Sequence, residues 1–352
     1  MRDSATGCIL SKRPTIADIA ARAGVSVSTV DRVLNSRHPV RGKTAEQVLA
    51  AAQDLHYHGV NLLAQRVEGG RQAVSLGLLI QSRTTTFFKE MAEQINQYAR
   101  FSRPDCRSIL IEEFEEMTPK AMAASIRNLS LKADVIGVMA FDHPLVNEAV
   151  SEVVALGKPV IAFLSNLSSP AVSAYVGIDQ RMAGRTCGWA LAKLLNHSGK
   201  IALLIESYQY RAFQEREIGI RSYMLEHEPG IEFCEGVYGI ASTSVVERMF
   251  EELLARHPDL KGVYFVGAGI AAALKVLEDI PKERWPIIVC HELTPVTRSA
   301  LSAGTVGVVL DSPRRELARE IVDRMIEAAT GQASRRDHPP VEFRFYCPEN
   351  II

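Results

Sequence analysis

The sequence has few of the features expected of an exported, membrane-bound or metal-stabilised protein. Its six cysteines are scattered along 352 residues, and no two of them form a CxxC pair. This spacing argues against a disulfide framework and a zinc site, and is typical of buried thiols in a reducing compartment. No run approaches the roughly 18 apolar residues of a membrane span, and the N-terminus lacks a signal-like apolar core. We therefore expect a cytoplasmic protein that binds neither a metal nor a membrane.

Common catalytic signatures are also absent, since the chain contains no GxSxG, no HExxH and no Walker lysine motif. One segment keeps an enzymatic alternative open. Gly267, Gly269 and Ala272 fit the GxGxxA dinucleotide fingerprint, and Glu292 follows about twenty residues later. Such glycines let a pyrophosphate approach a helix N-terminus, while the acid would hold a ribose hydroxyl. This segment therefore leaves an NAD(P)-dependent oxidoreductase as the alternative function. The interpretation that we favour from the rest of the sequence is a protein that is not an enzyme and has no cofactor.

Charge is nearly balanced overall but unevenly distributed. The formal net charge is −1, which excludes a general electrostatic attraction to nucleic acid. Residues 1–72, however, hold ten Lys and Arg side chains against six Asp and Glu. A basic head on a mildly acidic body suggests that the head meets a polyanion.

Helical periodicity dominates the head. Apolar residues recur at three- and four-residue spacing within 16–23, 30–34 and about 44–55. Ala20, Gly24 and Val30 supply, in that order, the small contact residue, the turn residue and the apolar anchor that two steeply crossing helices need. The pattern predicts a helix-turn-helix, although the spacing alone also suits any small helical bundle.

From Ala73 onward, apolar strand-like runs alternate with amphipathic helical runs. This alternation predicts parallel sheets covered on both faces, and eight or more such units indicate two sheets rather than one. Ligands of open parallel sheets bind beyond the C-terminal ends of the strands. We therefore expect the functional residues of the body in those loops.

The head closely resembles the headpiece of the lactose-repressor (LacI/GalR) family. The matching stretches are TIADIAARAGVS, STVDRVLN and KTAEQVLAAAQDLHY, and the resemblance implies that Ser26–Asn35 is a recognition helix in the major groove. Arg32 would grip a guanine edge and Val27 a thymine methyl. By resemblance, the base-reading positions are Val27, Ser28 and Arg32, and the phosphate-contacting positions are Thr15, Ser26, Thr29, Asn35 and Lys43.

The head and hinge depart from the family pattern at two points. Asp31 stands where the family has Ser, and it would repel phosphate unless Arg32 or a cytosine amino group answers its charge. The hinge segment, 61–72, follows a run without the usual proline. Val67 falls at the position of the side chain that wedges into the minor groove, and Leu63 is a second candidate for that contact. A plain flexible linker is the alternative for this segment.

The body resembles the periplasmic sugar-binding (ribose-type) fold that the same family uses as its sensor, and YVGIDQRMAGR is the most specific stretch. The resemblance implies an α/β protein, with a small all-α helix-turn-helix headpiece and a two-lobed, periplasmic-binding-protein-like body of parallel sheets. The expected domains are 13–60 for the head, 61–72 for the hinge and 73–352 for the sensor. Within the sensor, one lobe is expected from about 73–179 with 292–310, and the other from about 180–291 with 311–340.

Ligand-binding positions of that fold carry over to the loops of the body. The expected effector-binding residues are Phe87, Phe88, Ser165, Asn166, Arg216, His291, Glu292 and Asp311. Aromatic rings suit the C–H face of a sugar, and the fork of an arginine can hold two oxygens. The usual Asn-Asp after 263–266 is replaced by Gly267-Ala268, so we expect Glu292 or Asp311 to supply the missing carboxylate. A polyol, a sugar acid and a phosphosugar all stay open as ligands.

Together these resemblances imply a sequence-specific, DNA-binding transcriptional regulator, most commonly a repressor. Its operator affinity would be controlled allosterically by a small sugar-like effector. A homodimer on a near-palindromic operator is expected, because a twofold protein demands a twofold site. The expected partners are thus double-stranded operator DNA, the effector and a second copy of the chain.

Overall fold

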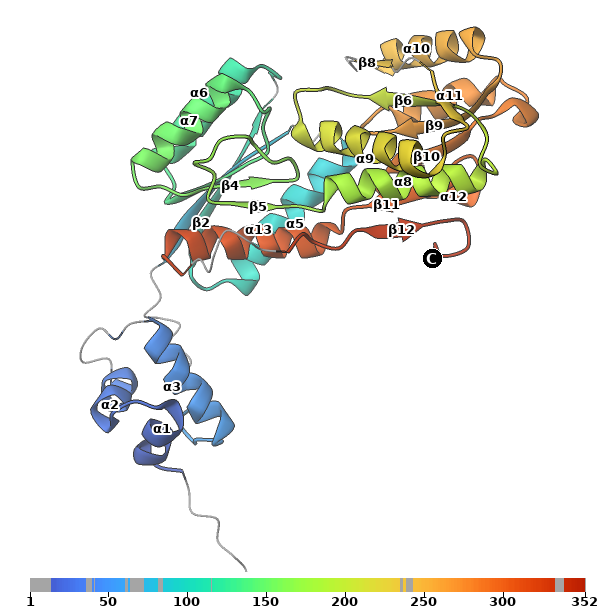
Figure 1. Cartoon of the computed structure of the whole chain (residues 1–352). Coiled ribbons are helices and arrows are strands. Elements are labelled where there is room, and N and C mark those ends of the chain that lie inside the picture. Colours follow the sequence, from blue (N-terminus) through green and yellow to red (C-terminus); the bar gives the residue numbers. More distant parts are fainter. Residues whose placement is uncertain are drawn as a thin grey trace, which may run out of the picture. The chain divides into compact units, whose positions relative to one another are not determined.

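The computed structural model describes residues 14–35, 40, 42–60, 63, 73–81, 85–114, 116–234, 237–238, 243–332 and 339–351. The chain divides into two compact units, 1–73 and 74–352. The smaller unit is helical, and the larger one combines helices with two sheets (Figure 1). Within the described residues, no helix is both long and apolar enough to cross a membrane.

The smaller unit contains α1 (Ile16–Ala23), α2 (Val27–Asn35) and α3 (Gly42–Asp54). Thr15 caps α1 through a reciprocal pair of hydrogen bonds with Asp18. Gly24 ends α1 in the left-handed conformation, at φ 66°, which glycine adopts without steric cost. Ile19 and Val30 are fully buried in the core that the helices share. The predicted helix-turn-helix is therefore confirmed.

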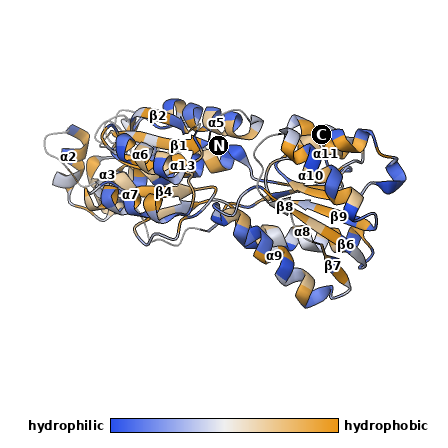
Figure 2. Cartoon of the chain, turned by 90° about the horizontal axis from the view of Figure 1, so that it is seen from above, coloured by the Kyte–Doolittle hydropathy of each residue, from blue (hydrophilic) through white to orange (hydrophobic). Residues whose placement is uncertain are grey.

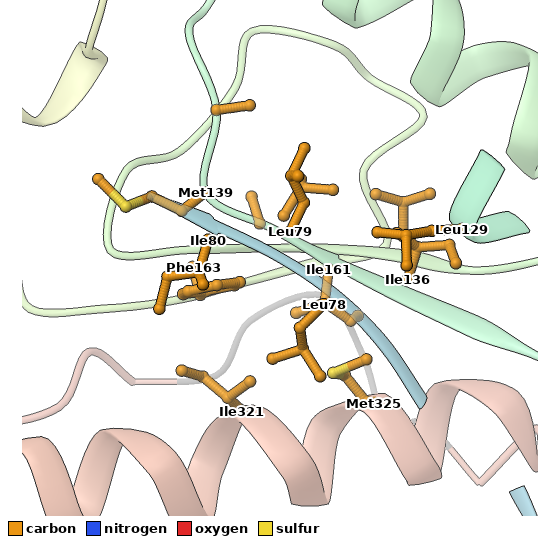
Figure 3. Close-up of a cluster of buried hydrophobic side chains, with 14 of the residues drawn as sticks. Leu78, Leu79, Ile80, Leu129, Ile136, Met139, Ile161, Phe163, Ile321 and Met325 are labelled. Atoms are coloured by element: carbon orange, nitrogen blue, oxygen red, sulfur yellow. The ribbon is translucent and has the colours of Figure 1, made fainter. Parts of the chain in front are cut away.

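The first lobe of the larger unit is a parallel sheet in the order β2-β1-β3-β4-β5. Its strands are β1 (Val74–Gln81), β2 (Cys106–Phe114), β3 (Val135–Val138), β4 (Val160–Phe163) and β5 (Ala174–Val176). Its helices are α5 (Thr86–Ser102), α6 (Pro119–Ser130), α7 (Pro144–Ala155) and α13 (Arg314–Ala329). Figure 3 shows Ile321 and Met325 of α13 pointing toward Leu78 and Ile161 of the sheet. This apolar contact makes α13 part of the first lobe.

The second lobe is a sheet in the order β12-β11-β10-β9-β6-β7, with β8 beside the end of β6. Its strands are β6 (Gly199–Ile205), β7 (Ile231–Phe233), β8 (Val237–Tyr238), β9 (Leu260–Phe265), β10 (Ile287–His291), β11 (Val308–Asp311) and the antiparallel β12 (Arg344–Tyr346). Its helices are α8 (Gln180–Leu194), α9 (Arg211–His227), α10 (Thr243–Arg256), α11 (Ile270–Glu278) and α12 (Pro295–Ser302), with a 3₁₀ turn at Lys282–Arg284. In Figure 2 the strands β6 and β9 are hydrophobic, whereas α9 alternates along its length. The predicted two-sheet α/β architecture is confirmed.

The predicted assignment of 292–310 to the first lobe and of 311–340 to the second is wrong. β11 pairs with β10, so α12 and β11 extend the second sheet, as successive right-handed β-α-β units should. α13 crosses instead to the first lobe. There a Cβ on Gly137 would lie 3.0 Å from the sulfur of Met325, so the missing side chain makes room for the helix.

Two glycines let α8 and α9 approach to backbone contact. A Cβ added to Gly184 would lie 2.0 Å from the carbonyl oxygen of Arg216, and one added to Gly219 would lie 2.2 Å from that of Arg181. Backbone atoms cannot yield as the end of a flexible side chain does. The two glycines therefore set the position of Arg216 relative to α8.

Replacing Gly184 with Ala should lower the free energy of unfolding by about 1–3 kcal/mol, the usual cost of overpacking. The gain in helix propensity, about 1 kcal/mol, offsets only part of the clash. Chemical denaturation measures the change. Gly230→Ala is the matched control, because its Cβ would lie 3.8 Å from the nearest atom. Equal stability of the two variants would contradict the account.

Candidate DNA interface and ligand cavity

α2 buries one side and exposes the other. Val30 and Val33 are buried in the head core, whereas Val27 keeps 52% of its surface exposed. Ser28 and Arg32 are exposed as well. With 3.6 residues per turn, positions 27, 28 and 32 fall on the side opposite the core. The structure thus brings the three predicted base-reading residues onto one exposed face.

Hydroxyl groups gather at the start of α2. The Ser26 hydroxyl accepts a hydrogen bond from the Thr29 backbone N–H at 3.1 Å, and lies 2.8 Å from the hydroxyls of Ser28 and Thr29. Caps and phosphates use the same N–H groups at a helix start. Thr15 at the start of α1 and Lys43 in the first turn of α3 are both exposed. Their assignment to phosphate contacts stays a prediction.

Asp31 has a partner within its own helix. The Asn35 side-chain amide donates a hydrogen bond to the Asp31 carboxylate at 2.7 Å. Within the head, the hydrogen-bond partner of the Asp31 carboxylate is therefore the Asn35 amide rather than Arg32. The same bond occupies the side chain of Asn35, which is a predicted phosphate contact.

The hinge assignment is partly corrected. Leu63 is fully buried and packs in the core of the head, so it does not serve as a minor-groove wedge in this structure. Val67 lies outside the described residues, and its predicted role stays a prediction.

Residues of both lobes line a cavity of about 280 Å³ in the larger unit. Six of the eight predicted effector residues line it: Phe87, Phe88, Ser165, Arg216, His291 and Glu292. The cavity also contains Gln180, Glu206, Tyr210 and Phe213, which sequence reasoning missed. An acidic residue directly after an apolar strand was the available signal for Glu206.

Asn166 and Asp311 do not line the cavity, which corrects their prediction as effector residues. Asn166 uses its side-chain oxygen to accept from the Leu167 backbone N–H at 2.9 Å. Asp311 is buried, accepts from the Leu293 N–H at 2.9 Å and pairs with Arg314 at 3.2 Å. The Asn166 carboxamide and the Asp311 carboxylate therefore hold backbone N–H groups in place, and neither side chain faces the cavity.

Arg216 is a buried cation held by neutral acceptors. Its Nε donates to the side-chain oxygen of Gln180 and its Nη1 to the carbonyl of Val266, both at 2.8 Å. Its Nη2 lies 3.9 Å from Glu292 Oε1. Gln180 in turn donates to the carbonyl of Leu164 at 2.9 Å. A chain of hydrogen bonds therefore links the end of β4 in the first lobe to Arg216 in the second.

Glu292 follows β10 with a left-handed backbone, at φ 68°, an uncommon conformation for a residue with a side chain. The Ser312 hydroxyl and N–H donate to its carboxylate at 2.8 and 3.1 Å. Burial, together with the charge of Asp311, raises the pKa of Glu292 to about 7. The side chain therefore changes its charge near neutral pH.

His291 is buried beneath the cavity. Its Nε2 lies 2.6 Å from the hydroxyl of Tyr264, and burial followed by the Arg216 charge holds the pKa of His291 well below 6.5. The imidazole is therefore neutral at physiological pH, and it can donate or accept a hydrogen bond without adding charge.

The aromatic residues come from both lobes. Phe87 and Phe88, at the start of α5, meet edge to face with ring centroids 5.2 Å apart. Tyr210 and Phe213 approach from the start of α9, with the Arg216 guanidinium 5.7 Å from the Phe213 ring centroid. Phe87 and Phe88 do not form two parallel walls by themselves, and the second lobe supplies further ring surface.

The carboxylate that the chain lacks after β9 is supplied by Glu206, which follows the neighbouring strand β6. A Cβ on Gly267 would lie 2.9 Å from Glu206 Oε2, and the Ala268 N–H donates to that carboxylate at 3.2 Å. Since the GxGxxA segment places this acid where a pyrophosphate would bind, its charge opposes dinucleotide binding there. The geometry does not favour the oxidoreductase alternative.

A helix-turn-helix head and a two-lobed body around a cavity define the class of ligand-responsive, DNA-binding regulators. The family described as bacterial regulatory proteins, lacI family, matches residues 15–59, and the periplasmic binding protein domain matches 76–333. The chain belongs to the LacI family, with a periplasmic-binding-protein body, and it is a DNA-binding transcriptional regulator.

Relatives and solved structures agree with this assignment. The HTH-type transcriptional regulator GntR of Pseudomonas aeruginosa is 26% identical over 96% of each chain. The ribose operon repressor of Bacillus subtilis is 28% identical over 71% of each chain. A glucose-galactose binding protein from Geobacillus stearothermophilus shares the fold of the body, with a TM-score of 0.72 and 18% identity over 79% of this chain and 99% of that one.

The stability of the body should depend on pH through Glu292. Because its pKa is raised from 4.5 to about 7 on folding, the folded state binds the proton more tightly than the unfolded state. Relative to Glu292→Gln, the wild-type protein should therefore lose stability as pH rises from 4.5 to about 7. Denaturant titrations at several pH values measure this. A constant difference across that window would contradict the assignment.

Proposed function

We propose that this protein is a cytoplasmic, homodimeric repressor whose hold on a near-palindromic operator is controlled by a small sugar or polyol in the cavity. The observation that carries the proposal is the convergence of aromatic rings, a buried guanidinium and carboxylates around that cavity. Aromatic faces suit C–H surfaces, and the polar groups suit hydroxyls. The names of the ribose operon repressor and of the glucose-galactose binding protein support this ligand class.

On the DNA side, α2 enters the major groove of each half-site. Val27, Ser28 and Arg32 read base edges, while Thr15, Ser26, Thr29, Asn35 and Lys43 contact phosphates. Val67 is the wedge at the minor groove. Effector binding in the body and operator binding by the heads share a coupling free energy of about 1–3 kcal/mol, and effector releases the operator.

Arg32 and Lys43 should fail in different ways when replaced with Ala. Loss of Arg32 should cost about 1–3 kcal/mol on the preferred operator and relax base preference. Loss of Lys43 should weaken all duplexes alike and reduce the slope of log affinity against log salt by about 1. Fluorescence anisotropy with the native upstream promoter and with random duplex measures both. Unchanged base preference in Arg32→Ala would contradict the placement of α2 in the major groove.

Arg216→Ala should abolish the effector response, because it removes the guanidinium at the cavity and leaves Gln180 without its donor. Arg216→Lys keeps the charge but cannot donate to both Gln180 and Val266, so it should respond weakly. Arg221→Ala, on the same helix and paired with Glu217 at 2.7 Å, is the control.

The test is an operator gel shift with increasing sugar, after a thermal-shift screen of sugars and polyols identifies a ligand. If Arg216→Ala releases the operator normally when sugar is added, Arg216 is not part of the effector site. A screen without any bound sugar or polyol would refute the proposed effector class.

A further inference from the structure

Glu206 follows β6 and lies beside Gly267, the position after β9 where the chain has no carboxylate. Leu204 of β6 pairs with Phe265 of β9, and continuing this register places Glu206 next to Gly267. Besides the 2.9 Å approach to Glu206, a Cβ on Gly267 would lie 3.0 Å from the ring of Phe213. The Glu206 side chain therefore occupies the space that a larger residue after β9 would take, and it lines the cavity.

Two other cavity-lining residues carry buried polar atoms without a hydrogen-bond partner in the described part of the chain. They are the Tyr210 hydroxyl and His291 Nδ1, on side chains that are 1% and 5% exposed. Leaving a buried polar atom unpaired costs about 1–3 kcal/mol. Folded proteins rarely retain such atoms unless something satisfies them.

Glu206 carries a similar cost. Burial raises its pKa, against the opposing effects of the Ala268 N–H and the Arg216 charge, and its charge in turn acts on the Tyr210 hydroxyl. Glu206 and Tyr210 line the same cavity. Two unsatisfied polar atoms and a carboxylate with a raised pKa around one cavity indicate that these groups are kept for a ligand rather than for stability.

We propose that Glu206 is an effector-binding residue, whose carboxylate accepts hydrogen bonds from the hydroxyls of a neutral, polyhydroxylated effector. Tyr210 and His291, which line the same cavity and carry unsatisfied polar atoms, are the further polar groups for that molecule. This assignment rests on the proposed function. Of the ligands that the sequence leaves open, it excludes the sugar acids and phosphosugars and keeps the neutral sugars and polyols.

Charge around the cavity excludes an anionic group from this end of the ligand. Glu206 and Glu292 are both negative when ionised, and the Glu206 carboxylate already accepts the Ala268 N–H near the start of α11, where a phosphate would otherwise bind. Arg216 does not offset this charge fully, because it brings a single positive charge to a cavity that two carboxylates line.

Calorimetric titration of the full chain tests the proposal, with D-glucose, D-galactose and D-ribose as probes. Gluconate and glucose 6-phosphate are the matched anions of glucose, galactose 6-phosphate that of galactose, and ribose 5-phosphate that of ribose. The wild-type chain should bind at least one neutral sugar about tenfold or more tightly than its anionic counterpart. Glu206→Gln should weaken the neutral sugar at least about tenfold, as expected for the loss of a charged hydrogen bond, and should narrow the gap to the anion. Glu251→Gln, an exposed acid on α10, should change neither affinity.

A sugar that binds Glu206→Gln as tightly as the wild-type chain would overturn the role of Glu206 and leave the proposed function standing. Tighter binding of the acid or phosphate would overturn the neutral class. No binding by any probe would refute the proposed sugar effector itself.

Thermal unfolding at pH 8 without ligand gives a second, independent readout. Glu206→Gln should unfold at a higher temperature than the wild-type chain, because the amide removes a buried charge and can still accept from Ala268. A lower unfolding temperature would show that Glu206 is structural and would overturn the proposal whatever the sugars do.

Discussion

The placement of one buried cation governs the rest of the ligand cavity. Arg216 cannot be left unpaired away from water, because burying a charge without partners is very unfavourable. Its partners come from α8, from the end of β9 and from the loop after β10. Backbone contact at Gly184 and Gly219 brings α9 close enough for these bonds. Through Gln180 and Leu164 the same network reaches the first lobe, so one guanidinium couples helix packing, strand ends and the junction of the lobes.

The chain keeps costly groups around this cation. Glu292 has a left-handed backbone and a raised pKa, and Glu206 has a raised pKa as well. Strain and buried charge of this kind collect at functional sites, where the rest of the fold offsets their cost. In this protein the offset comes from three apolar cores, one in the first lobe and one on each face of the second sheet. A body stabilised in this way can hold a cavity whose polar atoms remain poorly satisfied until a ligand binds.

Much of the fold and part of the site could be predicted from sequence, since period and motif are local properties. The head spacing around Gly24, the alternation of strands and helices, and the placing of Arg216 within a helix and of His291 and Glu292 at the end of a strand all depend on short stretches of chain. Glu206 was missed because its role depends on the register between β6 and β9, and Tyr210 because a ring from the second lobe packs into the core of the first. Asp311 and α13 were misplaced for the same reason: a chain that crosses between lobes gives no local sign of the crossing.

The central claim is that ligand in the cavity and operator on the head influence each other's affinity. Linkage requires the effect to be reciprocal. The most direct measurement is therefore the affinity of the full chain for its effector with and without saturating operator duplex, at one salt concentration. The account predicts that operator weakens effector binding by the same factor, about 5- to 150-fold, by which effector weakens operator binding. Equal effector affinity in both conditions would contradict it.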